Sequence, residues 1–398
     1  MYEMRKADMA VNSFIPLSVP NFEGNEEKYV LDAVHQGWVS TGGAYIATFE
    51  KQLAEFLHVP AVAACQSGTS ALHLALVECG ICPGDSVIVP TLTFIAAVNP
   101  VKYQFARPIF MDCDESLCMD PVKLRTYCET ECELTDGILY DKTNHSRIKA
   151  VIVVHVFGNM ADMESIMDIA DQYGLQVIED ATEALGTKYL QGRYAGQYAG
   201  TIGHYGAYSF NGNKIITTGG GGAITARETE RLEHIKYLST QAKDDPLYYI
   251  HHEIGYNYRM TNVQAAIGVA QLEELPRFIE RKQNNYGVYQ SLLQDCQGGR
   301  LLDVRQGISS NRWFYSFALT DSCKTVKDIV EAMSEKNIQT RAIWGLIHEQ
   351  IPYEKDTAYQ IEQAVIYRDQ VVNLPCSTQL TVEEIAQVVN ELRGMGNW

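Results

Sequence analysis

The sequence of 398 residues lacks long apolar runs. None of its segments approaches the roughly 18 consecutive apolar residues that a transmembrane helix needs. The first ten residues are polar, include Glu3, Arg5, Lys6 and Asp8, and lack the apolar core of a signal peptide. These absences argue against a membrane partner and against export. We therefore expect a cytoplasmic protein.

Positive charge is also scarce, because 32 Lys and Arg residues stand against 49 Asp and Glu residues, a formal net charge of −17. Such an excess repels nucleic acid, so we expect no nucleic-acid partner, although a local basic pocket can still bind a phosphate. The composition is 46% hydrophobic and 20% charged, which is typical of a globular protein. A single core seldom grows beyond about 250–300 residues, so we expect two packed lobes.

The ten cysteines do not form the set of two C-x₂-C motifs that a zinc knuckle requires. Cys79 and Cys82 lie three positions apart, and a second group falls with His145 in the polar region 113–145. A zinc site is the alternative interpretation of this second group. We favour free, reduced thiols and expect no metal site.

Helix-like and strand-like segments alternate over the first two thirds of the chain. Apolar strands are expected at residues 61–65, 86–90, 108–112, 148–155, 175–178, 205–210 and 223–225. Amphipathic helices are expected at residues 26–36, 49–57, 70–79 and 163–173. Continuous rather than alternating apolar strands indicate a sheet that is covered on both faces. The order predicts a parallel α/β sheet with ligands at the carboxyl ends of its strands.

The pattern changes near residue 262 to a mixture of helices and strands. A long helix over 262–278 is expected to be kinked or ended by Pro276, and a second helix follows over 280–293. Further elements are expected at 312–319, 326–336 and 381–392, and the polar region 115–146 is interpreted as a surface excursion. We divide the chain into an N-terminal extension (1–11), a large domain (12–262) and a small C-terminal domain (263–398).

Two polar motifs lie next to predicted strands. The sequence Ser67-Gly68-Thr69-Ser70 opens a helix, where free backbone N–H groups bind a phosphate or where Ser67 is a simple N-cap. Glu179-Asp180 ends a strand, and a carboxylate at this position is well placed to meet a ligand cation. A solvated turn residue is the alternative interpretation.

The third motif centres on Lys214, which lies in a segment with few charges and precedes four glycines at 219–222. A lysine in a partly dry pocket has a lowered pKa and becomes nucleophilic. A surface lysine on a flexible loop is the alternative, which the apolar or small flanking residues disfavour. A lysine, an acid and an anion site are together what pyridoxal 5′-phosphate (PLP) requires for its aldehyde, its pyridine nitrogen and its phosphate.

The chain resembles the DegT/DnrJ/EryC1/StrS sugar aminotransferases. The matching blocks, in order, are GWVSTG (37–42), SGTSALH (67–73), PGD (83–85), TF (93–94), VHVFG (154–158), EDA (179–181), SFNGNK (209–214) and GYNYRMT (255–261). The resemblance implies the α/β, aspartate-aminotransferase-like fold of PLP enzymes of fold type I. Such a fold has a large domain with a mostly parallel seven-stranded sheet and a smaller α+β C-terminal domain.

The resemblance also implies roles for individual residues. Lys214 would bond covalently to PLP, and Asp180 would pair with the pyridine nitrogen. The backbone of Gly68 and Thr69, with the Ser209 hydroxyl, would hold the phosphate. These implied roles join the three motifs into one cofactor site.

Other positions carry implied roles of a less direct kind. Phe94 would stack on the ring, although a core Phe is the alternative. Asn257 would reach the phosphate from the second subunit of a homodimer with shared active sites. Many relatives carry Gln where this chain has Glu183, near the PLP 3′-oxygen, and a carboxyl there would bond when protonated or through a water. Arg341 and His348 match positions that contact substrate, with a surface or structural role as the alternative.

A narrower resemblance concerns the substrate. The segments 89–94, 209–222 and 241–246 resemble enzymes of legionaminic acid and bacillosamine pathways. This implies transamination at C4 of a nucleotide-linked 4-keto-6-deoxy sugar, such as UDP- or GDP-4-keto-2-acetamido-2,6-dideoxyhexose. Glutamate would be the amino donor, and the product would enter surface-glycan or nonulosonic acid biosynthesis. A PLP-dependent sugar dehydratase and a regulatory homologue are the alternatives, and the intact Lys214 argues against both.

Overall fold

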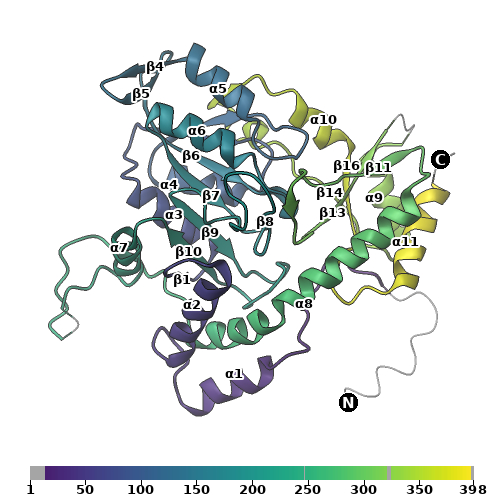
Figure 1. Ribbon diagram of the computed structural model, residues 1–398, viewed down its shortest axis with the longest axis horizontal. Coiled ribbons are helices and arrows are strands. Elements are labelled where there is room, and N and C mark those ends of the chain that lie inside the picture. Colours follow the sequence, from purple (N-terminus) through teal and green to yellow (C-terminus); the bar gives the residue numbers. More distant parts are fainter. Residues whose placement is uncertain (1–13, 246, 321–323, 396–398) are drawn as a thin grey trace.

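The computed structural model describes residues 14–245, 247–320 and 324–395. The N-terminal extension expected at 1–11 lies outside these described residues. The chain forms a ten-stranded sheet and a four-stranded sheet, with helices packed around both (Figure 1). A two-stranded pair, β8 (Lys188–Tyr189) with β12 (Ile308–Ser309), completes the strand pairing.

The large sheet contains a path of eight strands. Their order is β1 (Ala63–Cys65), β10 (Gly222–Ala226), β9 (Tyr205–Ser209), β7 (Gln176–Asp180), β6 (Arg147–Val154), β2 (Ser86–Pro90), β3 (Arg107–Met111) and β15 (Thr357–Tyr359). Neighbours from β9 to β15 are parallel, and β10 is antiparallel to both β1 and β9. The predicted mostly parallel α/β sheet is therefore confirmed. The first seven strands of the path are the expected ones, and β15 extends them.

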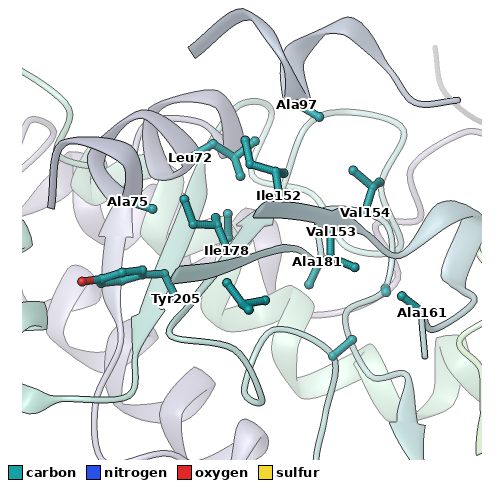
Figure 2. Close-up of a cluster of buried hydrophobic side chains, with 14 of the residues drawn as sticks. Leu72, Ala75, Ala97, Ile152, Val153, Val154, Ala161, Ile178, Ala181 and Tyr205 are labelled. Atoms are coloured by element: carbon teal, nitrogen blue, oxygen red, sulfur yellow. The ribbon is translucent and has the colours of Figure 1, made fainter. Parts of the chain in front are cut away.

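Helices pack on both faces of this sheet. Those with contacts to its strands are α2 (Ala44–Leu57), α3 (Gly68–Glu78), α4 (Asn99–Tyr103), α5 (Pro121–Thr130), α6 (Met163–Tyr173) and α7 (Thr229–Ser239), whereas α1 (Glu26–His35) packs on α8 (Asn262–Leu293). Figure 2 shows Leu72 of α3 beside Ile152 of β6, whereas the neighbouring Val153 points to the other face. From Ala150 to Val154 both faces of β6 are buried, which explains the continuous apolar run there.

The interpretation of residues 115–146 as a surface excursion was wrong. This region contains α5 and a hairpin of β4 (Cys132–Thr135) and β5 (Ile138–Asp141), and β5 joins the large sheet by pairing with β6. Asp136 and Gly137 both adopt positive φ at the hairpin turn. An Asp-Gly pair between two strands is a strong hairpin signal, so the sequence did contain the information.

The prediction of two helices around Pro276 was also wrong. A single helix, α8, runs from Asn262 to Leu293 with Pro276 inside it. Leu272, Leu275 and Phe278 are buried on both sides of the proline. The helix packs against α1 and α2 near its start and against α11 (Val382–Gly394) further on (Figure 1). This packing stabilises the helix against the loss of one backbone hydrogen bond at the proline.

The small sheet has its own core. Its strand order is β11 (Gly299–Leu301), β13 (Tyr315–Leu319), β16 (Val371–Leu374) and β14 (Arg341–Ala342), and the remaining helices are α9 (Val326–Glu335) and α10 (Gln363–Gln370). Buried residues of α8, β13, α9, β16 and α11 form a hydrophobic cluster separate from that of the large sheet. The C-terminal third nevertheless also supplies β15 to the edge of the large sheet.

Nine cysteines lie in the described part of the chain, and all are free thiols. Among the same residues, no group of three or more His, Cys, Asp and Glu side chains is arranged to hold a metal ion. No helix of the described segments combines the length and the apolar character that crossing a membrane requires.

Candidate active site

A cavity of about 720 Å³ lies where β6, β7 and β9 end. The last residues of these strands, Val154, Asp180 and Ser209, line it from the large sheet. Arg341 of β14 and Asn373 of β16 line it from the small sheet. The cavity therefore lies at the carboxyl edge of the parallel strands, where ligands of α/β sheets bind.

The cavity brings together most of the residues predicted from the sequence. Its lining includes Gly68, Thr69, Phe94, Asp180, Glu183, Ser209, Lys214 and Arg341. Two described residues, His348 and Asn257, do not line it. The Nδ1 atom of His348 lies 2.7 Å from Oγ1 of Thr91, and Asn257 forms a β-bridge with Thr240.

Lys214 lies in the loop that follows β9, and its side chain is 13% exposed. The buried residues Ile215 and Ile216 anchor the chain directly after it. Its Nζ atom lies 3.7 Å from Oε1 of Glu183 and 4.2 Å from the ring centroid of Trp313. The Trp313 indole N–H donates to the carbonyl of Asn213 at 2.8 Å, which ties the ring to the lysine loop. The amine is thus held at a defined place inside the cavity.

Asp180 is the last residue of β7 and is buried. Its Oδ1 accepts a hydrogen bond from the Thr182 N–H at 3.1 Å. Burial raises the pKa of this carboxyl above its ordinary value, although the Thr182 hydrogen bonds and the positive charge of Lys214 act in the opposite direction. A buried carboxylate of this kind is stabilised by a ligand cation.

Glu179 has a structural role that its neighbour Asp180 does not share. Its carboxylate lies 2.8 Å from Nε2 of His155 and accepts backbone N–H bonds from Gly200, Ile202 and Gly203. The other ring nitrogen, Nδ1 of His155, accepts from the Ala161 N–H, so the His155 proton is assigned to Nε2. Successive strand residues point to opposite faces, which explains why only Asp180 lines the cavity.

Glu183 is a buried carboxyl beside the lysine. Its Oε2 accepts a hydrogen bond from the Phe157 N–H at 2.9 Å. Burial raises the pKa of Glu183 to about 7, even though the charge of Lys214 and the Phe157 hydrogen bond both lower it. The group therefore titrates near neutral pH.

The start of α3 provides an anion site. Ser67 is the N-cap, because its hydroxyl accepts from the Ser70 N–H at 3.0 Å, so the capping interpretation is also correct. Gly68 and Thr69 open the helix, where N–H groups lack a helical carbonyl partner. A Cβ atom on Gly68 would lie 2.8 Å from Cγ2 of Thr182 and 2.9 Å from Cβ of Ser209. Only glycine allows this close packing beside the Ser209 hydroxyl.

These groups fit the three reactive parts of PLP. Lys214 would supply an amine for the aldehyde, and Asp180 would supply a buried carboxyl for the ring nitrogen. The N-terminus of α3 and Ser209 would supply donors for the phosphate. Phe94 lines the cavity from the chain that follows β2 and remains exposed there, as a residue that stacks on a ligand ring would.

The family model described as the DegT/DnrJ/EryC1/StrS aminotransferase family matches residues 20–393. The chain belongs to this family. The resemblance predicted from the sequence motifs is confirmed over nearly the whole length of this aminotransferase.

Curated relatives and solved structures agree with this assignment. EpsN of Bacillus subtilis (strain 168), named as a pyridoxal phosphate-dependent aminotransferase, is 36% identical over 383 residues and covers 95% of each chain. A GDP-perosamine synthase of Caulobacter vibrioides is 35% identical over 382 residues, which covers 95% of this aminotransferase and 97% of the relative. The crystal structure of a DegT DnrJ EryC1 StrS aminotransferase from Brucella abortus has a TM-score of 0.84 at 26% identity, over 94% and 96% of the two chains. The expected cofactor, PLP, is therefore that of the family.

Apart from Arg341, the residues that line the cavity from the C-terminal part of the chain were missed by the sequence motifs. Trp313, Phe314 and Trp344 line it together with Gln339 and Asn373. The rings of Trp313 and Phe314 are stacked at 3.9 Å between centroids. The aromatic run WFYSF (313–317) is a signal that could have found the first two residues. Gln339 lies in the mixed segment 337–342 and Asn373 in the apolar strand Val371–Leu374, and neither belongs to a motif that signals a site.

Proposed function

We propose that this aminotransferase uses PLP bound at Lys214 to aminate C4 of a nucleotide-linked 4-keto-6-deoxy sugar, with glutamate as the amino donor. The observation that carries the proposal is the single cavity that Lys214, Asp180, Gly68 and Ser209 share. The product class, an amino sugar nucleotide, suits surface-glycan or nonulosonic acid biosynthesis.

PLP, when bound, supplies an electron sink that lets an amino group leave one carbon and join another. The Asp180 carboxylate would hold a proton on the ring nitrogen, which would keep that sink effective. Lys214 would anchor the cofactor and, whenever its amine is free, would move the proton to and from the reacting carbon. Glu183 would store a proton beside this amine, and Phe94 would cover the ring face and exclude water.

The small sheet supplies the substrate side of the cavity. Among the described residues that line it, Lys214 and Arg341 are the cationic side chains. Arg341 binds an anionic group, either the diphosphate of the nucleotide or the carboxylate of glutamate, because its planar fork fits both. Trp344 and Phe314 offer apolar surface to a sugar ring or base. The named GDP-perosamine synthase relative supports a sugar nucleotide as the acceptor.

We also propose that the active sites are shared in a homodimer. Asn257 follows an exposed apolar loop, in which Leu247, Tyr248, Tyr249 and Ile254 are mostly accessible, Ile254 to 87%. Contiguous exposed apolar residues of this size mark an interaction surface. A second copy that covers this loop would bring Asn257 of the partner subunit toward the phosphate end of the cavity.

The test offers the PLP-loaded protein and glutamate to a panel of UDP- and GDP-linked 4-keto-6-deoxy sugars, with and without a 2-acetamido group. Mass spectrometry detects the amino product. We expect one nucleotide series to be aminated by the wild type and none by Lys214→Ala, whose visible cofactor band is also lost. Absence of any aminated product with glutamate, in a protein that shows the cofactor band, would overturn the proposed substrate class.

A further inference from the structure

A second cavity, of about 420 Å³, lies at the opposite edge of the large sheet. Arg147 and Lys149, at the start of β6, line it, whereas Val154 at the end of the same strand lines the active site. The rise of a strand separates Lys149 from Val154 by roughly 17 Å. Figure 1 shows the β4–β5 hairpin and α7, which border this second cavity, on the side of the large sheet away from the small sheet.

The charge of this cavity differs from that of the molecule. Four Lys and Arg side chains line it against two carboxylates, Glu78 and Glu228, in a chain whose net charge is −17. They come from different elements that the topology brings together. Arg147 and Lys149 begin β6, and Arg227 follows β10, whose last residue lies beside the first residue of the antiparallel β9. Arg231 projects from α7.

Two of these cations already have carboxylate partners. Arg147 makes a two-pronged contact with Asp85 at 2.9 and 2.8 Å, and Arg231 lies 2.9 Å from Glu78. Lys149 and Arg227 instead donate to backbone carbonyls. Lys149 Nζ lies 2.8 Å from the Gly80 oxygen, and an Arg227 terminal nitrogen lies 2.7 Å from the Ile202 oxygen. Within the described chain, the positive charges of these two residues are not compensated by an ion pair.

His204 adds a neutral donor to the same wall. Its Nδ1 accepts the Val177 N–H at 2.9 Å, so the proton of the neutral ring is on Nε2. Burial and the nearby Arg227 lower the pKa of His204, which favours the neutral ring. The cavity therefore combines two uncompensated cations with a fixed N–H donor.

We propose that this cavity binds a phosphate-bearing anion through Lys149, Arg227 and His204. Guanidinium and ammonium groups form charge-assisted hydrogen bonds with phosphate oxygens, and these are about twice as strong as neutral ones. Free inorganic phosphate or pyrophosphate and the diphosphate of a nucleotide share this chemistry. The site is separate from the active site, so the proposal does not depend on which sugar is aminated.

The experiment measures binding to the PLP-loaded protein, in which the cofactor phosphate already occupies its own site. Isothermal titration with inorganic phosphate, pyrophosphate, UDP and GDP compares wild type with the double variant Lys149→Gln/Arg227→Gln. We expect binding in the wild type and at least about tenfold weaker binding in the double variant, since two charge-assisted contacts are lost. The matched control is Lys327→Gln, an exposed lysine on α9, which should bind like the wild type.

The measured affinities distinguish which ligand binds and in which of the two cavities it binds. Binding of phosphate and pyrophosphate with the strength of UDP and GDP identifies a free anion, whereas tighter binding of one nucleotide identifies that nucleotide. Binding that survives in the double variant but is lost in Arg341→Gln belongs to the active site and overturns the proposal. So does a wild-type protein that binds none of the four. If the double variant loses its cofactor band, the single variant Lys149→Gln replaces it, with binding severalfold weaker than in the wild type expected because one contact is lost.

Discussion

At the scale of single residues, Glu183 has the largest consequence, because its buried carboxyl lies beside the Lys214 amine at a position where the family resemblance led us to expect Gln. Its hydrogen bond from Phe157 suits either residue, since a Gln side-chain oxygen accepts it equally well. What differs is the proton. A Glu at 3.7 Å from the Lys214 amine gains or loses a charge near neutral pH, whereas a Gln does not.

Glu183→Gln is expected to flatten the pH dependence of stability in the cofactor-free protein. The folded pKa of about 7 lies above the ordinary value of 4.5, so the folded state binds more protons and stability falls as pH rises between these values. The fall is on the order of 3 kcal/mol. Thermal unfolding from pH 4 to 8 measures it, with the exposed Glu331→Gln as the control. Parallel profiles for wild type and Glu183→Gln would contradict the expectation.

Gly68→Ala is expected to weaken PLP binding by at least about tenfold, because the new Cβ would displace Ser209 or Thr182 from the start of α3. Titration of the cofactor-free protein with PLP, followed by its visible band, gives the affinity. Gly212→Ala is the matched control in the same region, because a Cβ atom there meets nothing within 4 Å. Equal affinities in the two variants would show that the phosphate does not bind beside Gly68.

The sequence predicted which side chains meet in one cavity where a motif fixes the local backbone. Asp180 ends a strand, Gly68 opens a helix and Lys214 precedes a glycine run. All three line one cavity in the structure. Arg341 and His348 were equivalent in the sequence, yet only Arg341 lines the cavity, because His348 pairs with Thr91. That difference depends on how β14 meets β16, which no local pattern encodes.

At the scale of elements, the N-terminal cap stabilises α8, the helix that contributes buried residues to both hydrophobic clusters. Thr261 and Gln264 form a capping box, in which the Gln264 side chain accepts the Thr261 N–H at 3.1 Å. Thr261→Ala is expected to destabilise the protein by about 1 kcal/mol, whereas Thr261→Ser retains the cap. Urea unfolding checks this, and an alanine variant as stable as the serine variant would contradict it.

The elements that the sequence predicted well are those whose apolar pattern is decided locally. Strand β2 and helix α6 match their expected bounds because burial sets their whole length. Pro276 was misjudged because the packing of α8 against α1, α2 and α11 outweighs the local cost of the proline. The two-residue strands β8 and β14 exist only through their partners and have no signal of their own.

At the scale of the whole molecule, a shared active site predicts complementation between subunits. Lys214→Ala and Asn257→Asp should each be strongly impaired, the second because a carboxylate would repel the phosphate. When equal amounts are unfolded and refolded together, half of the dimers are mixed and each has one site with both residues intact. About a quarter of the wild-type activity is then expected. Activity no higher than the average of the two variants would argue that Asn257 acts within its own subunit or not at all.

The position of β15 has a consequence for synthesis of the chain. Residues 357–359 close the edge of β3, although β3 itself is made some 250 residues earlier. While the ribosome translates the intervening segment, β3 presents unpaired backbone groups to any other strand, which is the usual origin of aggregation. We therefore expect a chain truncated before β15 to express mainly as insoluble material.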